Sequence, residues 1–130
     1  MFSHDQLIFA VAKLHPNLQH GKDFWAAHPV ETGSAKQLAE AEIIAWRAKG
    51  ISQPGTDVLR ETFAEHADEW HASEHRLKRG TLLTGSDWTQ TQDLPEDFRK
   101  RWAEYRKALR EMPKQQGFPR SVDWPDPPVE

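Results

Sequence analysis

The sequence predicts an α+β fold that is predominantly helical. An N-terminal helix with a small two-stranded β element precedes a long helical hairpin and an extended proline-rich C-terminal tail. Two observations predict this order. Apolar residues recur at the three- and four-residue steps of a helix face over three segments, and five of the nine prolines follow residue 112. We therefore divide the chain into a small α/β module, residues 1–55, and a helical hairpin with its tail, residues 56–130.

The first helix is predicted over residues 3–14. Ser3 can cap this helix, and Gln6 three residues later completes a capping box. The helix ends before Pro16, because the residue that precedes a proline is pushed out of the helical region. Its apolar positions have helical spacing: Leu7, Ile8, Val11 and Leu14.

Two interpretations of residues 35–49 are open on local grounds. Residues 23–28 form a candidate strand, which Pro29 confines to the edge of a sheet. The alanine, glutamine, leucine and glutamate content of residues 35–49 favours a helix by propensity. The apolar run from Ile43 to Trp46 suits a buried strand equally well, and the resulting two-stranded hairpin would need the first helix as a cover.

A long amphipathic helix is predicted over residues 57–83, with Thr56 as its cap and a bend at Gly80. Its narrow apolar stripe needs a partner helix to cover it. The stripe consists of Leu59, Phe63, Ala67, Trp70 and Leu77.

The partner helix is predicted from Pro95, a residue tolerated in the first turn, to Met112, before Pro113. Two helices with one apolar stripe each predict an antiparallel helical hairpin. We expect Phe118 and Trp124 of the extended tail to dock on this hairpin or on a partner. The apolar residues of the second helix step by 4, 4, 3, 4 and 3 positions: Leu94, Phe98, Trp102, Tyr105, Leu109 and Met112.

The N-terminus and the charge pattern indicate a soluble intracellular protein. The first residues include no basic region, and Lys13 interrupts the first apolar run, so neither a signal peptide nor a membrane span is expected. Between Arg76 and Arg120 there are 11 Lys and Arg against 6 Asp and Glu. A basic face of this kind suits an acidic partner or nucleic acid. A solvated helix surface explains it with fewer assumptions, and no base-stacking motif is present, so we expect no nucleic-acid partner.

The sequence offers little for catalysis or for a cofactor. His71 and His75 share one helix face at a metal-ligand spacing, but no third ligand is fixed and the pattern His-Glu-x-x-His is absent. The chain also has no cysteine, no nucleophile elbow and no phosphate-binding glycine loop. We therefore predict no enzyme, no catalytic residue, no metal and no cofactor.

Aromatic and arginine residues are the candidates for partner binding. Trp88 and Trp124 lie outside helices, where tryptophan pins a loop or anchors an interface. Arg106 and Arg110 share one helix face and can grip a carboxylate, including those of the tail. Core packing and simple solvation are the alternatives for these residues. The predicted partner-binding set is Trp88, Tyr105, Arg106, Arg110 and Trp124.

A spaced set of aromatic, arginine and proline residues occupies residues 76–125. It comprises Leu82-Leu83, Ser86-Asp87-Trp88-Thr89-Gln90, Asp93, Pro95, Trp102, Tyr105-Arg106, Leu109-Arg110, Pro113, Gly117-Phe118-Pro119 and Trp124-Pro125. This pattern resembles the C-terminal region of the phage tail assembly chaperone family. Glu111 departs from it, since the family commonly has aspartate at that place.

The front part has a weaker likeness to the N-terminal module of tailed-phage and prophage proteins. The likeness implies that residues 42–47 form a strand paired with residues 24–30, with residues 34–40 inserted in the hairpin. It rests on His15-Pro16, Gly21, Asp23-Phe24, Ile44, Trp46 and Gln53-Pro54.

The resemblance implies a non-enzymatic protein that helps to build the phage tail or its fibres in the bacterial host cytoplasm. Such a protein binds a tail or tail-fibre protein and shields or positions it during virion assembly. The alternative is a structural accessory protein that stays in the mature phage tail. The resemblance implies no catalytic residue, and it leaves the identity of the client and a homo-oligomeric state open.

Overall fold

The computed structural model describes residues 1–129 and confirms the predominantly helical α+β class. The chain separates into two compact units, Met1–Ala67 and Asp68–Glu130, which we call unit 1 and unit 2. The predicted domain division between residues 55 and 56 stays a prediction. Within the described residues, no helix combines the length and the apolar character needed to span a membrane.

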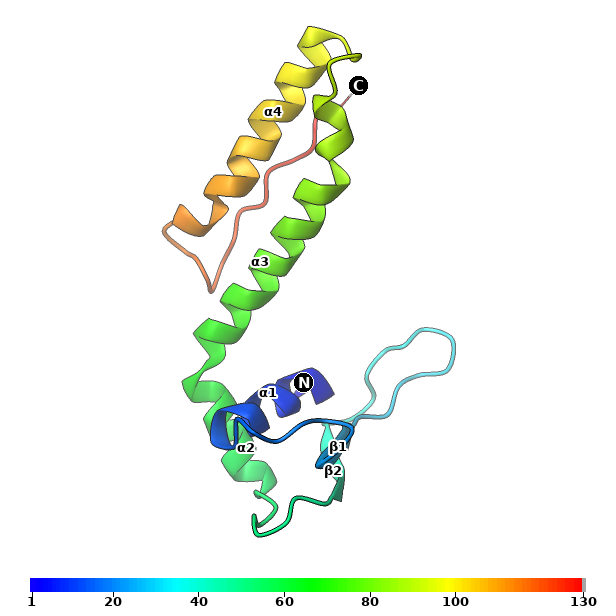
Figure 1. Cartoon of the computed structure of the whole chain (residues 1–130), viewed down its shortest axis with the longest axis vertical. Coiled ribbons are helices and arrows are strands. Elements are labelled where there is room, and N and C mark those ends of the chain that lie inside the picture. Colours follow the sequence, from blue (N-terminus) through cyan, green and yellow to red (C-terminus); the bar gives the residue numbers. More distant parts are fainter. Residues whose placement is uncertain (130) are drawn as a thin grey trace. The chain divides into compact units, whose positions relative to one another are not determined.

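Unit 1 contains the predicted first helix, α1, at His4–Leu14. Ser3 caps α1, because its Oγ accepts a hydrogen bond from the Gln6 N–H at 3.2 Å and the Gln6 side chain accepts one from the Ser3 N–H at 3.0 Å. The apolar face of α1 packs with two strands and with helix α2, Thr56–Glu65 (Figure 1). The buried members of this core are Phe2, Leu7, Ala10, Val11, Phe24, Ala26, Ala41 and Leu59.

The two strands confirm the strand interpretation of the contested segment, and the helix interpretation of residues 35–49 is wrong. Strand β1, Phe24–Ala27, pairs antiparallel with strand β2, Glu42–Trp46, and the register shifts between Trp25 and Ala26. Ile43 and Trp46 pack against the core of unit 1 from β2. Tertiary packing of β-branched and aromatic side chains therefore outweighs the local helix propensity.

The single helix predicted over residues 57–83 is wrong, because the structure has α2 and a separate α3, Ala67–Gly85. The break lies at His66, whose φ is −114° and ψ 15°. The His66 N–H bonds to the Phe63 carbonyl three residues back, which interrupts the α-helical ladder. Gly80 lies inside α3 and does not end it, and the bend expected there stays a prediction. The cap of α2 is Gly55 rather than Thr56, and it makes no side-chain hydrogen bond.

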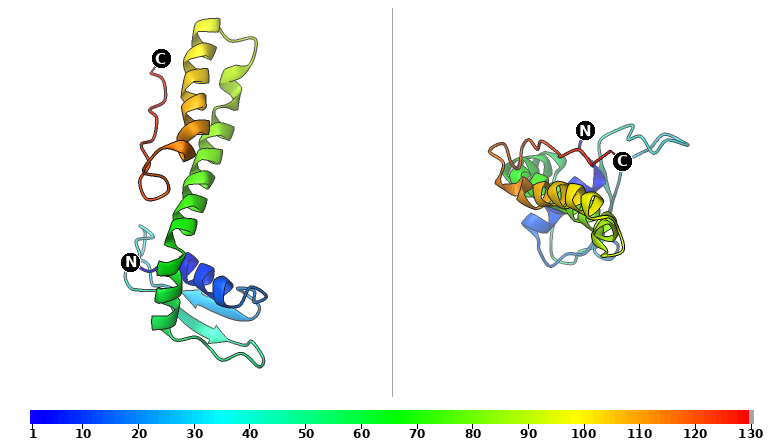
Figure 2. Two further views of the ribbon diagram at one scale, coloured as in Figure 1. Left: turned by 90° about the vertical axis from the view of Figure 1, so that its left-hand side faces the viewer. Right: turned by 90° about the horizontal axis from the view of Figure 1, so that it is seen from above.

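Unit 2 is formed by α3, α4 and the chain that follows them. Figures 1 and 2 show α3 and α4, Glu96–Glu111, side by side and antiparallel, as the helical hairpin interpretation requires. Two short 3-10 helices flank α4: η1 at Asp87–Gln90 and η2 at Met112–Lys114. Helix α4 begins one residue after the predicted Pro95, which is its N-cap. Residues 121–129 form no helix or strand, and an extended tail there stays a prediction.

Candidate functional site

The connection between α3 and α4 is held by Arg106. We call residues 86–90 the η1 corner. The Arg106 Nη1 donates to the Leu83 carbonyl at 2.6 Å and to the Ser86 Oγ at 2.7 Å, and its Nη2 donates to the Asp87 Oδ1 at 2.7 Å. Ser86 is buried, and its hydroxyl also donates to the Leu82 carbonyl at 2.8 Å. One guanidinium from α4 therefore fixes the C-terminal end of α3 and the start of η1.

The remaining polar residues of the η1 corner also have structural roles. Thr89 is fully buried, and its hydroxyl donates to the Ser86 carbonyl. Gln90 reaches α4, where its Nε2 donates to the Arg99 carbonyl at 3.1 Å. The sequence Ser-Asp-Thr-Gln around Trp88 is therefore explained by hydrogen bonds that shape the corner.

Trp88 is different, because 55% of its surface is exposed. It rests on aromatic residues of α4: its ring centroid lies 5.8 Å from that of Phe98 and 6.4 Å from that of Trp102. Trp102 in turn makes an edge contact with the buried Tyr105 at 5.5 Å. Burial raises the pKa of the Tyr105 hydroxyl. The corner thus presents one large exposed ring on a supported aromatic base.

Arg110 and Trp124 lie apart from the η1 corner. Arg110 is exposed near the end of α4, and its backbone carbonyl accepts from the Arg79 side chain at 3.5 Å. Trp124 packs on α3, with its ring centroid 5.9 Å from that of His75 and 4.3 Å from the Lys78 ammonium. The structure therefore brings Trp88, Tyr105 and Arg106 together, and it does not bring Arg110 or Trp124 to them.

Backbone contacts fold the chain back after α4. Two hydrogen bonds of 2.8 Å join the Gln115 side chain to the backbone of Asp123. The Gln115 Nε2 donates to the Asp123 carbonyl, and the Asp123 N–H donates to the Gln115 Oε1. Gly117 packs closely against Ser121, because a Cβ there would meet the Ser121 hydroxyl and lie 3.1 Å from the Ser121 carbonyl oxygen. Arg120 then forms an exposed ion pair with Asp68 at the start of α3, at 3.0 Å. Sequence reasoning missed this pair, since residues 52 positions apart carry no local signal.

The Asp68–Arg120 pair predicts a local pH dependence of tail docking. The hydrogen bond from Arg120, together with the charges of Arg120 and His71, lowers the pKa of the Asp68 carboxyl. A carboxyl with a lowered folded-state pKa contributes stability above its unfolded pKa of about 3.9, and this contribution is lost as the pH falls through the folded pKa. We expect the amide signals of residues 118–121 to shift below about pH 4 in an NMR titration. The Asp68→Asn variant should lack this transition, and an unchanged transition in it would contradict the role of the pair.

Among residues 1–129, no three histidine, aspartate or glutamate side chains lie close enough to share a metal ion. The two histidines considered for a metal have other surroundings in the fold. The His75 ring lies 6.2 Å from Phe118 and 5.9 Å from Trp124, and His71 contributes to the electrostatic surroundings of Asp68. The features of unit 2 that a partner could contact are therefore an exposed aromatic ring, exposed cations and a shallow helix surface.

Two family models match consecutive parts of the chain. Residues 72–129 match the family model described as phage tail assembly chaperone protein. Residues 7–71, half of the chain, match the model described as XkdW protein. No curated protein and no solved structure gives a significant match. The chain therefore belongs to the XkdW family by its front half, its residues 72–129 match the phage tail assembly chaperone family, and the two matches together support a role in phage tail assembly.

Proposed function

We propose that this protein is a non-enzymatic chaperone that binds a phage tail-fibre protein and shields or positions it in the host cytoplasm during virion assembly. One observation carries the proposal beyond the family: Trp88 is a large, mostly exposed aromatic residue on a corner that hydrogen bonds hold in place. An exposed tryptophan on a preorganised support is the kind of residue that anchors protein interfaces, because little conformational entropy is lost when it is buried.

The five predicted partner-binding residues take different parts in this proposal. Trp88 and the exposed Arg110 are proposed to contact the client directly. Trp124 is half-buried against α3, and the exposed part of its ring is proposed to contact the client. Tyr105 is buried and Arg106 is mostly buried, so both are proposed to position Trp88 without contacting the client.

Co-expression tests the proposal. A tail-fibre protein of the same phage should give a higher soluble yield with the wild-type chain than without it. The Trp88→Ala variant should lose most of this gain, because hot-spot aromatic residues contribute about 2–4 kcal/mol to an interface. Leu38→Ala is the matched control, since Leu38 in unit 1 is 56% exposed and has no place in the proposed surface. An equal yield with and without the wild-type chain would contradict the proposal.

Mass spectrometry of purified particles separates this function from that of a retained tail component. A chaperone should be absent from mature particles or present well below the amount of the tail proteins. A stoichiometric presence in washed particles would favour the structural accessory protein.

A further inference from the structure

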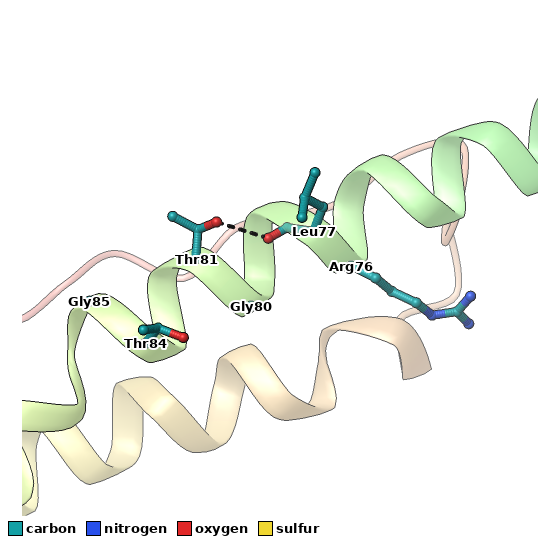
Figure 3. Close-up of a pocket in the computed structure, with 6 residues that line it drawn as sticks. All are labelled: Arg76, Leu77, Gly80, Thr81, Thr84 and Gly85. Atoms are coloured by element: carbon teal, nitrogen blue, oxygen red, sulfur yellow. Dashed lines mark hydrogen bonds between the residues drawn. The ribbon is translucent and has the colours of Figure 1, made fainter. Parts of the chain in front are cut away.

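Helix α3 carries an open groove on a face that its own fold leaves uncovered. The groove has a volume of about 560 Å³, and Figure 3 shows its lining residues. Leu77 and Thr81 project from the side of α3 away from α4, whereas Arg76 and Thr84 project from the side toward it (Figure 3). Gly80 lies between these two rows and has no side chain to fill the space. The groove therefore deepens at Gly80.

The spacing of the lining residues is that of a helix-packing site. A side chain from one helix inserts into a hole formed by residues at i, i+3, i+4 and i+7 of the facing helix. Leu77, Gly80, Thr81 and Thr84 have this spacing, and all four are exposed. Leu77 has 74% of its surface exposed, so it offers apolar area to a partner at one end of this set. The groove is thus shaped to receive an apolar side chain from another helix.

Gly80 has no role in the internal packing of the protein. A Cβ built on Gly80 would meet no atom within 4 Å, and α3 continues regularly on both sides of it. Glycine inside a helix is less stable than alanine, so an unpacked helical glycine weakens the free protein. A glycine at this position would allow a second helix to pack close to α3, which is a role that no contact within the protein provides.

The charges around the groove select one class of partner. Residues 75–86 contain no aspartate or glutamate. Arg76 lines the groove, and Lys78 lines the adjoining depression beside Trp124. The nearest carboxylate on α3 is that of Glu74, which lines the same depression as Lys78. A second copy of α3 packed here would bring its own Arg76 and Lys78 close to these cations, which is unfavourable. An acidic helix complements them.

We infer that the α3 groove binds an amphipathic helix with acidic flanks and a large apolar residue, supplied by the tail protein under assembly. The inference rests on the proposed function for the identity of the client, but the groove is testable without it. The apolar residue of the client helix fills the hole at Gly80, and its carboxylates face Arg76 and Lys78. This surface is separate from the η1 corner, so the client is held at two places on unit 2.

A designed peptide tests the groove directly. The probe is a fluorescein-labelled helix of about 20 residues, which matches the length of α3, with leucines on one stripe and glutamates beside it. The matched probe has lysine in place of every glutamate. Fluorescence anisotropy should show binding of the acidic probe to the full chain at least tenfold tighter than that of the basic probe.

Variants locate the binding in the groove. Gly80→Leu fills the hole and should weaken binding of the acidic probe at least tenfold, and Arg76→Glu should remove the preference for the acidic probe. Gly80→Ala should raise the melting temperature, because alanine favours the helix, while it weakens binding. This opposite effect separates a binding role from a folding defect. Leu38→Ala is the control and should bind as the wild type does.

Equal binding of the acidic probe by the wild type and Gly80→Leu, or no binding by either, would overturn the inference. A dimer of the wild type that Gly80→Leu dissociates in analytical ultracentrifugation would also overturn it, in favour of a second copy as the occupant. The co-expression assay distinguishes the two proposals. If the wild type and Gly80→Leu raise the client's yield equally, the proposed function stands and the groove is not used.

Discussion

Replacing Phe24 by alanine is expected to unfold most of unit 1. Phe24 is 1% exposed, and its ring packs 5.5 Å from His20 and 5.8 Å from Trp46. Removing a buried phenylalanine costs about 3–5 kcal/mol, because the apolar contacts are lost and a cavity remains. A unit of this size has a total stability of only about 3–10 kcal/mol. In a two-dimensional amide NMR spectrum, the dispersed signals of β1, β2 and α1 should collapse toward unfolded positions.

Ile44 is the matched control for Phe24. It lies on β2 with 65% of its surface exposed, so Ile44→Ala should change stability by no more than about 0.5 kcal/mol. Signals of α4 serve as an internal reference for unit 2. Intact unit 1 signals in the Phe24→Ala variant would contradict the placement of this core.

Replacing Arg106 by methionine is expected to loosen the η1 corner by about 2–3 kcal/mol, which is the range for losing hydrogen bonds to a charged donor. Arg106 is only 15% exposed, and its removal takes one donor from each of Leu83, Ser86 and Asp87. The amides of Thr89 and Thr91, which donate to carbonyls within the corner, should exchange with solvent about 30- to 150-fold faster.

Two other variants separate geometry from charge at this position. Arg106→Lys keeps the charge but not the planar fork that reaches three acceptors, so it should recover only part of the protection. Asp87→Asn removes the most exposed partner of Arg106 and should have a small effect, because exposed ion pairs contribute little. Wild-type exchange rates in Arg106→Met would show that the guanidinium does not hold the corner.

Local signals were sufficient for α1 and α4. Ser3 and Gln6 at capping-box spacing mark the start of α1, and the regular apolar steps from Phe98 to Leu109 define α4. The break at His66 carries no such signal, because no glycine or proline marks it and the apolar spacing continues across it. For β2, local propensity left helix and strand equally open, because the strand is stabilised by contacts of Ile43 and Trp46 with the core of unit 1.

The contacts of the predicted partner-binding residues could not be read from the sequence, and their role in binding stays a prediction. Trp88 lies outside the α-helices and is exposed, as expected for an interface anchor. The carboxylate partner of Arg106 is Asp87, in the η1 corner, whereas the sequence offered the tail carboxylates Asp123 and Asp126 as candidates. Several aspartates could pair with this arginine by residue type, and only the folded structure shows which one lies close to it. The α3 groove could not be predicted either, because the sequence does not show which faces of a helix stay exposed after folding.

Photo-crosslinking in cells that assemble virions tests the central claim most directly. A photoreactive amino acid at position 88 should crosslink to a tail protein of the phage, because Trp88 is proposed to lie in the client interface. The same residue at position 38 should give no such product, although Leu38 is equally exposed. Crosslinks to the tail protein from position 88 alone are the predicted result. No tail-protein crosslink from position 88, or equal crosslinking from both positions, would contradict the account.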